Sequence, residues 1–259
     1  MFGKNGLELY LGREIRQVHK LYYCESESEC RLCAMKGYGQ FCPIAKASEI
    51  LGERWTNLII REVGAGSEAF NDLRKGLPLL SPSLLSARLK SLEAAGVILR
   101  TESDQGIRYE LTEAGRELKP IILAMGTWGH RWVRSNLDQD DLDVSLLMWD
   151  IHRTMNVEYF DSERKVLLFE FSDYTSRFRR WWLIIDDGEV DVCMKDPGHE
   201  IDLQLLTDVR TLTGVWMGDI GLNQAIRTRQ LRMTGPAKLK RDISIWLGAN
   251  YFADVKPAV

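Results

Sequence analysis

Residues 81–96 read SPSLLSARLKSLEAAG, and this stretch decides the fold of the N-terminal half of the chain. It opens with Ser81, a residue type that caps helix N-termini, and with Pro82, whose fixed φ suits the first helical turn. It closes at Gly96, the residue type that most often follows the end of a helix. Between these signals the leucines recur at spacings of four and three, which predicts a helix that buries Leu85, Leu89 and Leu92.

Short helices are also predicted upstream of this stretch. Helical periodicity covers residues 43–51, which begin at a proline, and residues 54–63 and 69–76, which end beside or at a glycine. In the second of these helices we expect one buried face, made of Trp55, Leu58, Ile59 and Val63.

Downstream of Gly96 the apolar period changes from helical to alternating. Residues 97–103 and 107–112 flank a DQG turn and predict a β-hairpin. Thr112 then caps a predicted helix over 113–133, in which we expect Pro120 to cause a bend. Three short helices followed by a hairpin are the order of a winged helix-turn-helix, whose third helix enters the DNA major groove.

The polar side of the helix at 81–95 has the composition expected of a DNA-reading surface. Its residues are small or form hydrogen bonds, so the helix could sit deep in a groove, and its free N–H groups could face a phosphate. Basic side chains on the preceding helix and on the hairpin are candidate phosphate contacts, which predicts binding that weakens with salt. Alternatively, these charges only solvate a small helical domain. The predicted DNA-binding residues are Ser81, Ser83, Ser86, Arg88, Lys90, Arg74, Lys75, Arg100 and Arg108.

Several motifs of this region together resemble one protein family. They are Cys42-Pro43, the Gly-x-x-Trp that ends at Trp55, Phe-Asn-x-Leu from Phe70, Leu-x-x-Arg-Leu-x-x-Leu from Leu85, and Tyr-x-Leu-Thr-x-x-Gly from Tyr109. With them, residues 38–132 resemble the HxlR-type family of bacterial transcriptional regulators. The resemblance implies a winged helix-turn-helix domain over residues 35–135 that binds double-stranded DNA as a homodimer. The hairpin TESDQGIRYE is short for that family, so we expect its grip on DNA to be slight.

The helix at 113–133 carries a stripe of large apolar residues at spacings of three and four. We expect the stripe to form the dimer contact, because two-fold symmetry lets two such units read half-sites about 34–36 Å apart. The alternative is packing within its own domain. The predicted dimerisation residues are Leu118, Ile122, Met125, Trp128 and Trp132.

The C-terminal half has a different pattern, with strand-like and helical segments mixed, and it begins after an acidic linker at residues 136–144. Strand-like runs separated by turns predict an α+β domain with a mainly antiparallel sheet over residues 145–255. We expect strands at 157–160, 165–171, 180–185, 189–195 and 230–235, and helices around 205–217 and 236–247.

The segment from Trp181 to Leu247 resembles a sterol-carrier-like domain. The resemblance rests on a strand pair, an acidic third strand, a helix that ends in a glycine, the motif GLNQAIRTRQLRMTG and a final helix. Domains of that kind hold lipids or other apolar small molecules between sheet and helices, which implies an apolar effector here. The resemblance assigns no ligand-contacting residue. Most of the large side chains are expected in the core: Trp181, Trp182, Leu183, Ile184, Trp216, Met217 and Trp246.

Four of the five cysteines lie between residues 24 and 42. Cys42 precedes Pro43 at a helix start, where free N–H groups favour a thiolate, and in some members of the resembled family the matching cysteine senses oxidants or electrophiles. The alternative, which we prefer, is half-buried packing at a dimer interface. Cys24, Cys30 and Cys33 lie in an irregular segment, residues 1–34, that is either a true extension or an artefact of start-codon choice. Only Cys30 and Cys33 have a typical ligand spacing, so we expect no metal and no cofactor.

Charge and composition narrow the classes of function. The 259 residues carry a net charge of −3, with +3 on residues 35–135 and −6 on residues 136–259, which favours an N-terminal half that meets an anion. No apolar run is long enough for a membrane span and no signal peptide is recognised, so we expect a cytoplasmic protein with no membrane partner. The scattered histidines and the lack of a nucleophile motif argue against an enzyme.

These observations predict a sequence-specific transcriptional regulator whose C-terminal domain senses an apolar small molecule. Two alternatives stay open at this point. One is a small-molecule carrier whose helical domain mediates only protein contacts, and the other is a regulator that senses redox state through Cys42.

Overall fold

The computed structural model describes residues 37–104, 106–133, 138, 141–161, 163–256 and 258. The chain divides into two compact units, Met1–Leu123 and Ala124–Val259. The division falls inside one long helix, α6 (Glu113–Trp132), so each unit holds about one half of it. The predicted domain ranges, 35–135 and 145–255, stay predictions.

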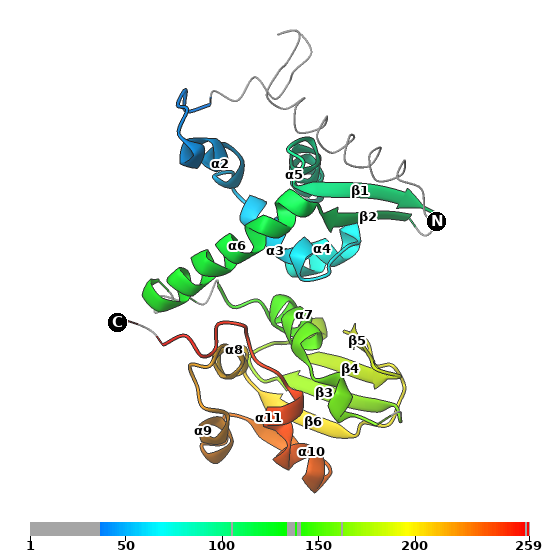
Figure 1. Ribbon diagram of the computed structural model, residues 1–259. Coiled ribbons are helices and arrows are strands. Elements are labelled where there is room, and N and C mark those ends of the chain that lie inside the picture. The colour runs from blue at the N-terminus through cyan, green and yellow to red at the C-terminus, as the bar shows by residue number, and fades with distance from the viewer. Residues whose placement is uncertain are drawn as a thin grey trace, which may run out of the picture. The chain divides into compact units, whose positions relative to one another are not determined.

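The N-terminal unit is a set of helices followed by a two-stranded hairpin (Figure 1). The predicted helix at 43–51 and the predicted hairpin strands are confirmed to within a residue. Its elements are α2 (Pro43–Leu51), α3 (Thr56–Gly64), α4 (Phe70–Gly76), α5 (Pro82–Ala94), β1 (Ile98–Ser103) and β2 (Gly106–Leu111), followed by the first half of α6.

The core of this unit forms where α5 meets α3 and α4. The three leucines of the α5 stripe are at most 2% exposed, and they belong to one cluster with Ile59 and Ile60 of α3 and Leu73 of α4. The face predicted for α3 is partly wrong, because Leu58 is 40% exposed and Ile60 is buried in its place. Residues 58–60 are three consecutive apolar residues, and a helix can turn only part of such a run toward one core.

A buried carboxylate joins α3 to α4. Glu62 is fully buried, and its carboxylate accepts hydrogen bonds from Arg61 Nη2 at 2.6 Å and from Ser67 Oγ at 3.2 Å. The same Arg61 guanidinium donates to the carbonyl oxygen of Gly76, at 3.4 Å, where α4 ends. A buried charge is tolerated only when it is paired and hydrogen-bonded, so this network fixes the helix pair that supports α5.

The start of α6 is fixed by Thr112, as predicted. Its Oγ1 accepts a hydrogen bond from the backbone N–H of Gly115 at 3.1 Å and donates to the carbonyl oxygen of Gly96 at 2.6 Å. The helix then continues without interruption through Pro120 to Trp132.

The C-terminal unit is a five-stranded sheet with helices, in the order β5-β4-β3-β6-β7. Only the β3–β6 pair is parallel among these strands, so the sheet is mainly antiparallel, as predicted. The elements are α7 (Val144–Thr154), η4 (Val157–Tyr159), β3 (Lys165–Phe171), η5 (Ser176–Phe178), β4 (Arg180–Asp186), β5 (Glu189–Cys193), β6 (Leu203–Thr207), α8 (Val209–Met217), α9 (Leu222–Arg227), β7 (Arg232–Thr234), α10 (Ala237–Arg241) and α11 (Ile243–Trp246).

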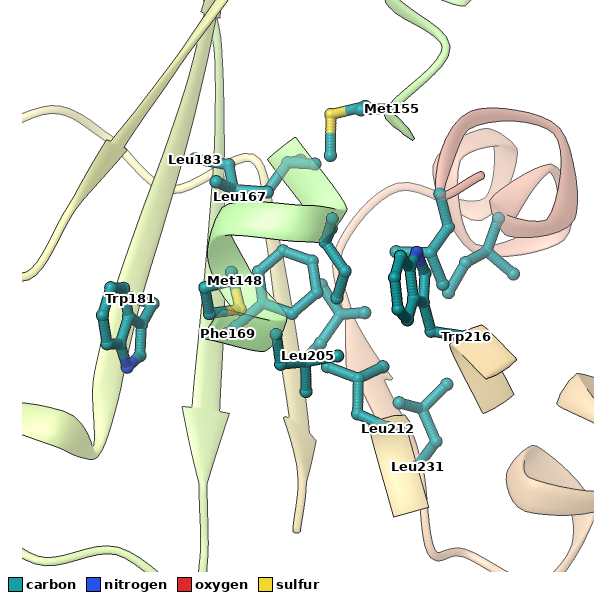
Figure 2. Packing of buried hydrophobic residues seen from close by; sticks show 14 of the residues in the cluster. Met148, Met155, Leu167, Phe169, Trp181, Leu183, Leu205, Leu212, Trp216 and Leu231 are labelled. Carbon is teal, nitrogen blue, oxygen red and sulfur yellow. The ribbon is translucent and has the colours of Figure 1, made fainter. Parts of the chain in front are cut away.

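Helices α7 and α8 pack on one face of the sheet. Phe169 of β3 and Leu205 of β6 form a single buried cluster with Met148 of α7 and Trp216 of α8 (Figure 2). Most of the tryptophans predicted for the core are in this cluster. On the opposite face a smaller cluster holds Val166, Leu168 and Trp182.

Three expectations for this unit are wrong. Residues 157–159 form a 3-10 helix rather than a strand, and the helix expected from 205 begins at Val209, because Leu203–Thr207 is the parallel strand β6. This strand is only five residues long, and an apolar run of that length cannot be told from the start of a helix by periodicity alone. In the motif that includes GLNQAIR a short helix, α9, precedes the strand, and α7 was not expected at all.

Candidate nucleic-acid interface

The side of α5 that faces away from the core presents short polar residues and one lysine. Ser81, Ser83 and Lys90 are exposed, whereas Ser86 is half-buried. Ser81 Oγ accepts a hydrogen bond from the backbone N–H of Leu84 at 3.3 Å, which confirms Ser81 as the N-cap. Because Ser81 uses this oxygen as a cap, it fixes the helix start, and its Oγ lies 3.3 Å from that of Ser83.

Arg88 is also on α5 but has a different environment from Lys90. Its Nη2 lies 2.5 Å from Oε2 of Glu53, in the turn between α2 and α3, and its side chain is only 21% exposed. Its Nε is buried and has no hydrogen-bond partner within the part of the chain that the structure describes. The guanidinium therefore links α5 to the turn between α2 and α3 and does not extend away from the helix.

The other basic candidates, at the end of α4 and on the hairpin, differ in how they are paired. Lys75 forms an ion pair with Asp72 at 2.9 Å, and Arg100 pairs with Glu102 at 3.3 Å. Arg74 is exposed, and no ion pair to it is found among the described residues. Exposed ion pairs of this kind contribute little to stability, so a phosphate can replace the carboxylate at small cost.

The hairpin is anchored midway along β2 to the loop between α3 and α4. Arg108 of β2 pairs with Glu68 at 2.8 Å, and the backbone N–H of Tyr109 donates to the carbonyl oxygen of Glu68 at 2.9 Å. An isolated β-bridge joins Ala69 to Arg108. The hairpin is thus held beside α4, and Arg108 lies at this junction.

The apolar stripe of α6 is packed against the N-terminal core in its first part and exposed in its second part. Leu118 and Ile122 pack against the core of the N-terminal unit, which is the alternative to dimer contact for these two residues. Met125, Trp128 and Trp132 are 49%, 62% and 51% exposed. The C-terminal segment covers another side of this half of the helix, because the Phe252 ring lies beside Gly126 and 6.3 Å from the His130 ring.

A second exposed apolar surface lies at α2 and was missed from the sequence. None of the residues of α2 is buried, and Tyr38, Phe41 and Ile44 are 62%, 100% and 76% exposed. On α6, Ile121 is 50% exposed and was also missed. The spacing of Ile121 to Met125 and Trp128, four and then three residues, was the signal that could have identified it.

Cys42 is the N-cap residue of α2 and is a free thiol that is half-buried. Its side chain makes no capping hydrogen bond. Cys24, Cys30 and Cys33 lie outside the described residues. Within the described ranges no group of three or more His, Cys, Asp or Glu side chains is arranged to hold a metal ion, and no helix has the length and apolar character needed to cross a membrane.

Comparison with known proteins identifies the N-terminal unit. A family model described as HxlR-like helix-turn-helix matches residues 50–137. The HTH-type transcriptional regulator YvaP of Bacillus subtilis (strain 168) is 39% identical over 98 residues, which are 36% of this chain and 91% of YvaP. The HTH-type transcriptional regulator sll1512 of Synechocystis sp. (strain PCC 6803) is 35% identical over 112 residues, 42% of this chain and 80% of that protein.

Among solved structures, the reduced form of the transcriptional regulator YodB from B. subtilis is 27% identical, with a TM-score of 0.34, and covers 38% of this chain and 100% of YodB. The family match ends at residue 137, before α7 begins, and so it identifies the N-terminal part of the chain. Since this chain spans 91% of YvaP and 80% of sll1512 at 35% identity or more, it belongs to the HxlR-like helix-turn-helix family and is a DNA-binding transcriptional regulator.

Proposed function

We propose that this regulator is a homodimer that reads its operator with α5 and changes its DNA affinity when its C-terminal unit binds an apolar small molecule. The observation that carries the proposal is the two-sided character of α5. Leu85, Leu89 and Leu92 are buried on one side, while Ser83, Ala87 and Lys90 are exposed. Short side chains on an exposed helix face allow close approach to base edges, and Lys90 can reach a phosphate or a guanine.

The assignment of α5 is tested by DNA binding. Fluorescence anisotropy with the DNA upstream of the gene should give tight, salt-dependent binding for the full chain, and Lys90→Glu should lower the affinity at least tenfold. Lys195→Glu, which makes the same charge change at an exposed residue between β5 and β6, is the matched control and should leave the affinity within about twofold. Equal losses in the two variants would contradict the role of α5. An absence of DNA binding by the wild type would favour the carrier alternative.

The proposed homodimer is supported by two apolar surfaces that the described residues leave uncovered. A helix of nine residues such as α2 is marginal in water unless tertiary packing supports it, yet none of its residues is buried. The exposed aromatic pair Trp128 and Trp132 lies on a helix that a second copy could cover with the same helix, which makes a closed two-fold contact. A second copy is therefore the occupant that we propose for both surfaces.

The dimer is tested by analytical ultracentrifugation of the full chain. We expect the wild type to sediment as a dimer and Trp128→Glu to sediment mainly as a monomer. The control is Tyr251→Glu, which introduces the same charge at an exposed aromatic residue outside α2 and α6. A Trp128→Glu variant that stays dimeric would contradict the proposed interface.

The proposed sensing unit follows from the order of elements in the C-terminal half. Three antiparallel strands, a helix that ends at Gly218, a short strand and final helices follow one another, with the parallel strand β6 before α8 and the short helix α9 before β7. This order supports a sterol-carrier-like sensing unit as a proposal. The layer between sheet and helices is filled by large apolar side chains such as Phe169 and Trp216 (Figure 2). An apolar molecule that enters this layer would have to displace such side chains, which is a means of coupling binding to a change of structure.

Mass spectrometry of organic extracts from the purified protein should identify a bound apolar molecule. A ligand changes DNA affinity only if it binds the DNA-competent and DNA-incompetent states differently, so adding or removing that molecule should change operator affinity at least fivefold. Operator affinity that is identical with and without every bound molecule would contradict the sensing role.

A further inference from the structure

The last third of the C-terminal unit contains a strongly basic segment within an acidic half of the chain. Residues 220–241 include six lysines and arginines and no aspartate or glutamate, although residues 136–259 carry a net charge of −6. We call these six residues the basic edge: Arg227, Arg229, Arg232, Lys238, Lys240 and Arg241.

We propose that the basic edge binds the phosphates of DNA that flanks the operator, as a second DNA contact outside the winged helix-turn-helix. The proposal rests on the DNA-binding function of the chain but adds a surface that α5 and the hairpin do not include.

The fold places the basic edge on α9, on the edge strand β7 and on α10, which follow one another at the β7 side of the sheet (Figure 1). The turn between α9 and β7 is compact, because the backbone N–H of Leu231 donates to the carbonyl oxygen of Ala225 at 3.1 Å. In β7 the side chains alternate, so Met233 packs against the main core while Arg232 is exposed. The strand thus directs its arginine away from the core.

Most of these cations form no ion pair with any residue that the structure describes. Within the described ranges a single ion pair to the basic edge is found, from Arg241 to Asp242 at 2.8 Å. Lys238 lies over the ring of Tyr159, with its Nζ 5.6 Å from the ring centroid. By contrast, Arg88, Arg100 and Arg108 of the N-terminal unit each pair with a glutamate. Exposed cations on consecutive elements attract an anion, and a repeated phosphate backbone provides several at once.

DNA is favoured as the partner because the same chain binds it through α5. A second module on one chain meets its ligand at an effective concentration on the order of millimolar, so even weak phosphate contacts add to the affinity. Contacts of this kind carry no sequence information and increase the dependence on salt, by about one unit of slope per phosphate-binding residue.

The test measures the dependence of DNA affinity on salt for two duplexes. One duplex contains only the footprinted operator, and the other adds about 15 base pairs of unrelated sequence on each side. For the wild type we expect a steeper plot of log affinity against log salt on the long duplex. The variant Arg227→Gln/Arg229→Gln/Arg232→Gln should lower that slope by about 2 to 3 for each protomer of the proposed dimer on the long duplex and leave the short duplex unchanged.

Three controls separate the effect of charge at the basic edge from effects on folding and from the role of α5. The variant Arg164→Gln/Lys195→Gln/Lys256→Gln removes three exposed cations elsewhere in the unit and should keep the wild-type slope. The variant Arg227→Lys/Arg229→Lys/Arg232→Lys retains the three charges and should also keep the wild-type slope. Lys90→Glu should weaken binding to both duplexes, which distinguishes a failure of α5 from a failure of the basic edge.

A wild type with equal slopes on the two duplexes, or glutamine variants with the wild-type slope, would overturn the proposal. So would glutamine variants that lose affinity only for vesicles of anionic lipid.

Discussion

Arg88 of α5 and Glu53 of the turn before α3 form an ion pair, with 2.5 Å between Nη2 and Oε2. The pair lies at the base of the helix that we assign to the major groove, and the Arg88 side chain is only 21% exposed. An arginine held in this way positions the helix, whereas the exposed Lys90 two residues later is free to contact DNA.

We therefore expect two alanine variants of α5 to affect different properties, one the stability of the fold and the other the affinity for DNA. Arg88→Ala should lower the free energy of unfolding by about 1–2 kcal/mol, because it removes a half-buried charge pair and leaves Glu53 unpaired. Lys90→Ala should change stability by less than about 0.5 kcal/mol and lower DNA affinity instead. Urea unfolding and anisotropy titration measure the two quantities. If Lys90→Ala lowers the free energy of unfolding as much as Arg88→Ala does, the separate roles assigned to these two residues are wrong.

Gly115, in the first turn of α6, leaves no room for a side chain. A Cβ at this position would lie 2.1 Å from the carbonyl oxygen of Val97 and 3.2 Å from Leu111 Cδ2. Because the first of these atoms is backbone, it cannot move aside cheaply, and Gly115→Ala should lower the free energy of unfolding by about 2–4 kcal/mol.

The matched control for this variant lies on the same helix. A Cβ at Gly129 would meet nothing within 4 Å, so Gly129→Ala should raise stability by about 0.5–1 kcal/mol through helix propensity. Chemical denaturation of both variants checks the pair. A Gly115→Ala protein as stable as the wild type would show that β1 and α6 do not pack as described.

The contact between Tyr159 and Asp242 makes part of the stability of the C-terminal unit depend on pH. The Asp242 carboxylate is 2.8 Å from Arg241 Nε and accepts a hydrogen bond from Tyr159 Oη at 2.9 Å. The hydrogen bond from Arg241, and then that from Tyr159, hold the pKa of Asp242 below its ordinary value.

A carboxyl group whose pKa is lower in the folded state stabilises that state above its unfolded pKa, and this contribution is lost as the pH falls through the folded pKa. Asp242→Asn should therefore be less stable than the wild type at pH 7, and the difference should shrink as the pH falls below about 4. Thermal unfolding across pH 3–7 measures it. A difference that stays constant down to pH 3 would contradict the role of the charge.

For Cys42 we expect no essential role in sensing. Cys42→Ser should keep the wild-type response of DNA binding to peroxide and to quinones, because the proposed effector acts on the C-terminal unit. Anisotropy titrations before and after oxidant treatment provide the measurement. A response that is present in the wild type and lost in Cys42→Ser would establish the thiol alternative.

The sequence predicted the N-terminal unit well because its helices carry explicit start and stop signals. Pro43 and Pro82 begin helices where expected, and the leucine stripe of α5 is buried as expected. The C-terminal unit was predicted less well, since the strand at Leu203–Thr207 is only five residues long and is followed after one residue by the helix α8.

The environment of each candidate site residue was harder to predict than the fold. The partner of Arg88 is thirty-five positions away in the sequence, and no local pattern links Glu53 to α5. The exposed Phe41 and Ile44 look like ordinary core residues until the packing of α2 is known. Sequence periodicity indicates which faces are apolar, but it does not say which of them the same chain covers.

The central claim is that α5 lies in the major groove of the operator in a two-fold dimer. It is tested most directly by photo-crosslinking from Ala87, which is exposed on α5 and is replaced by p-benzoylphenylalanine. This placement of α5 predicts crosslinks to bases in two clusters about 34–36 Å apart, one per half-site, and no crosslink from the same probe at Lys195. Crosslinks from Lys195 but not from Ala87 would contradict it.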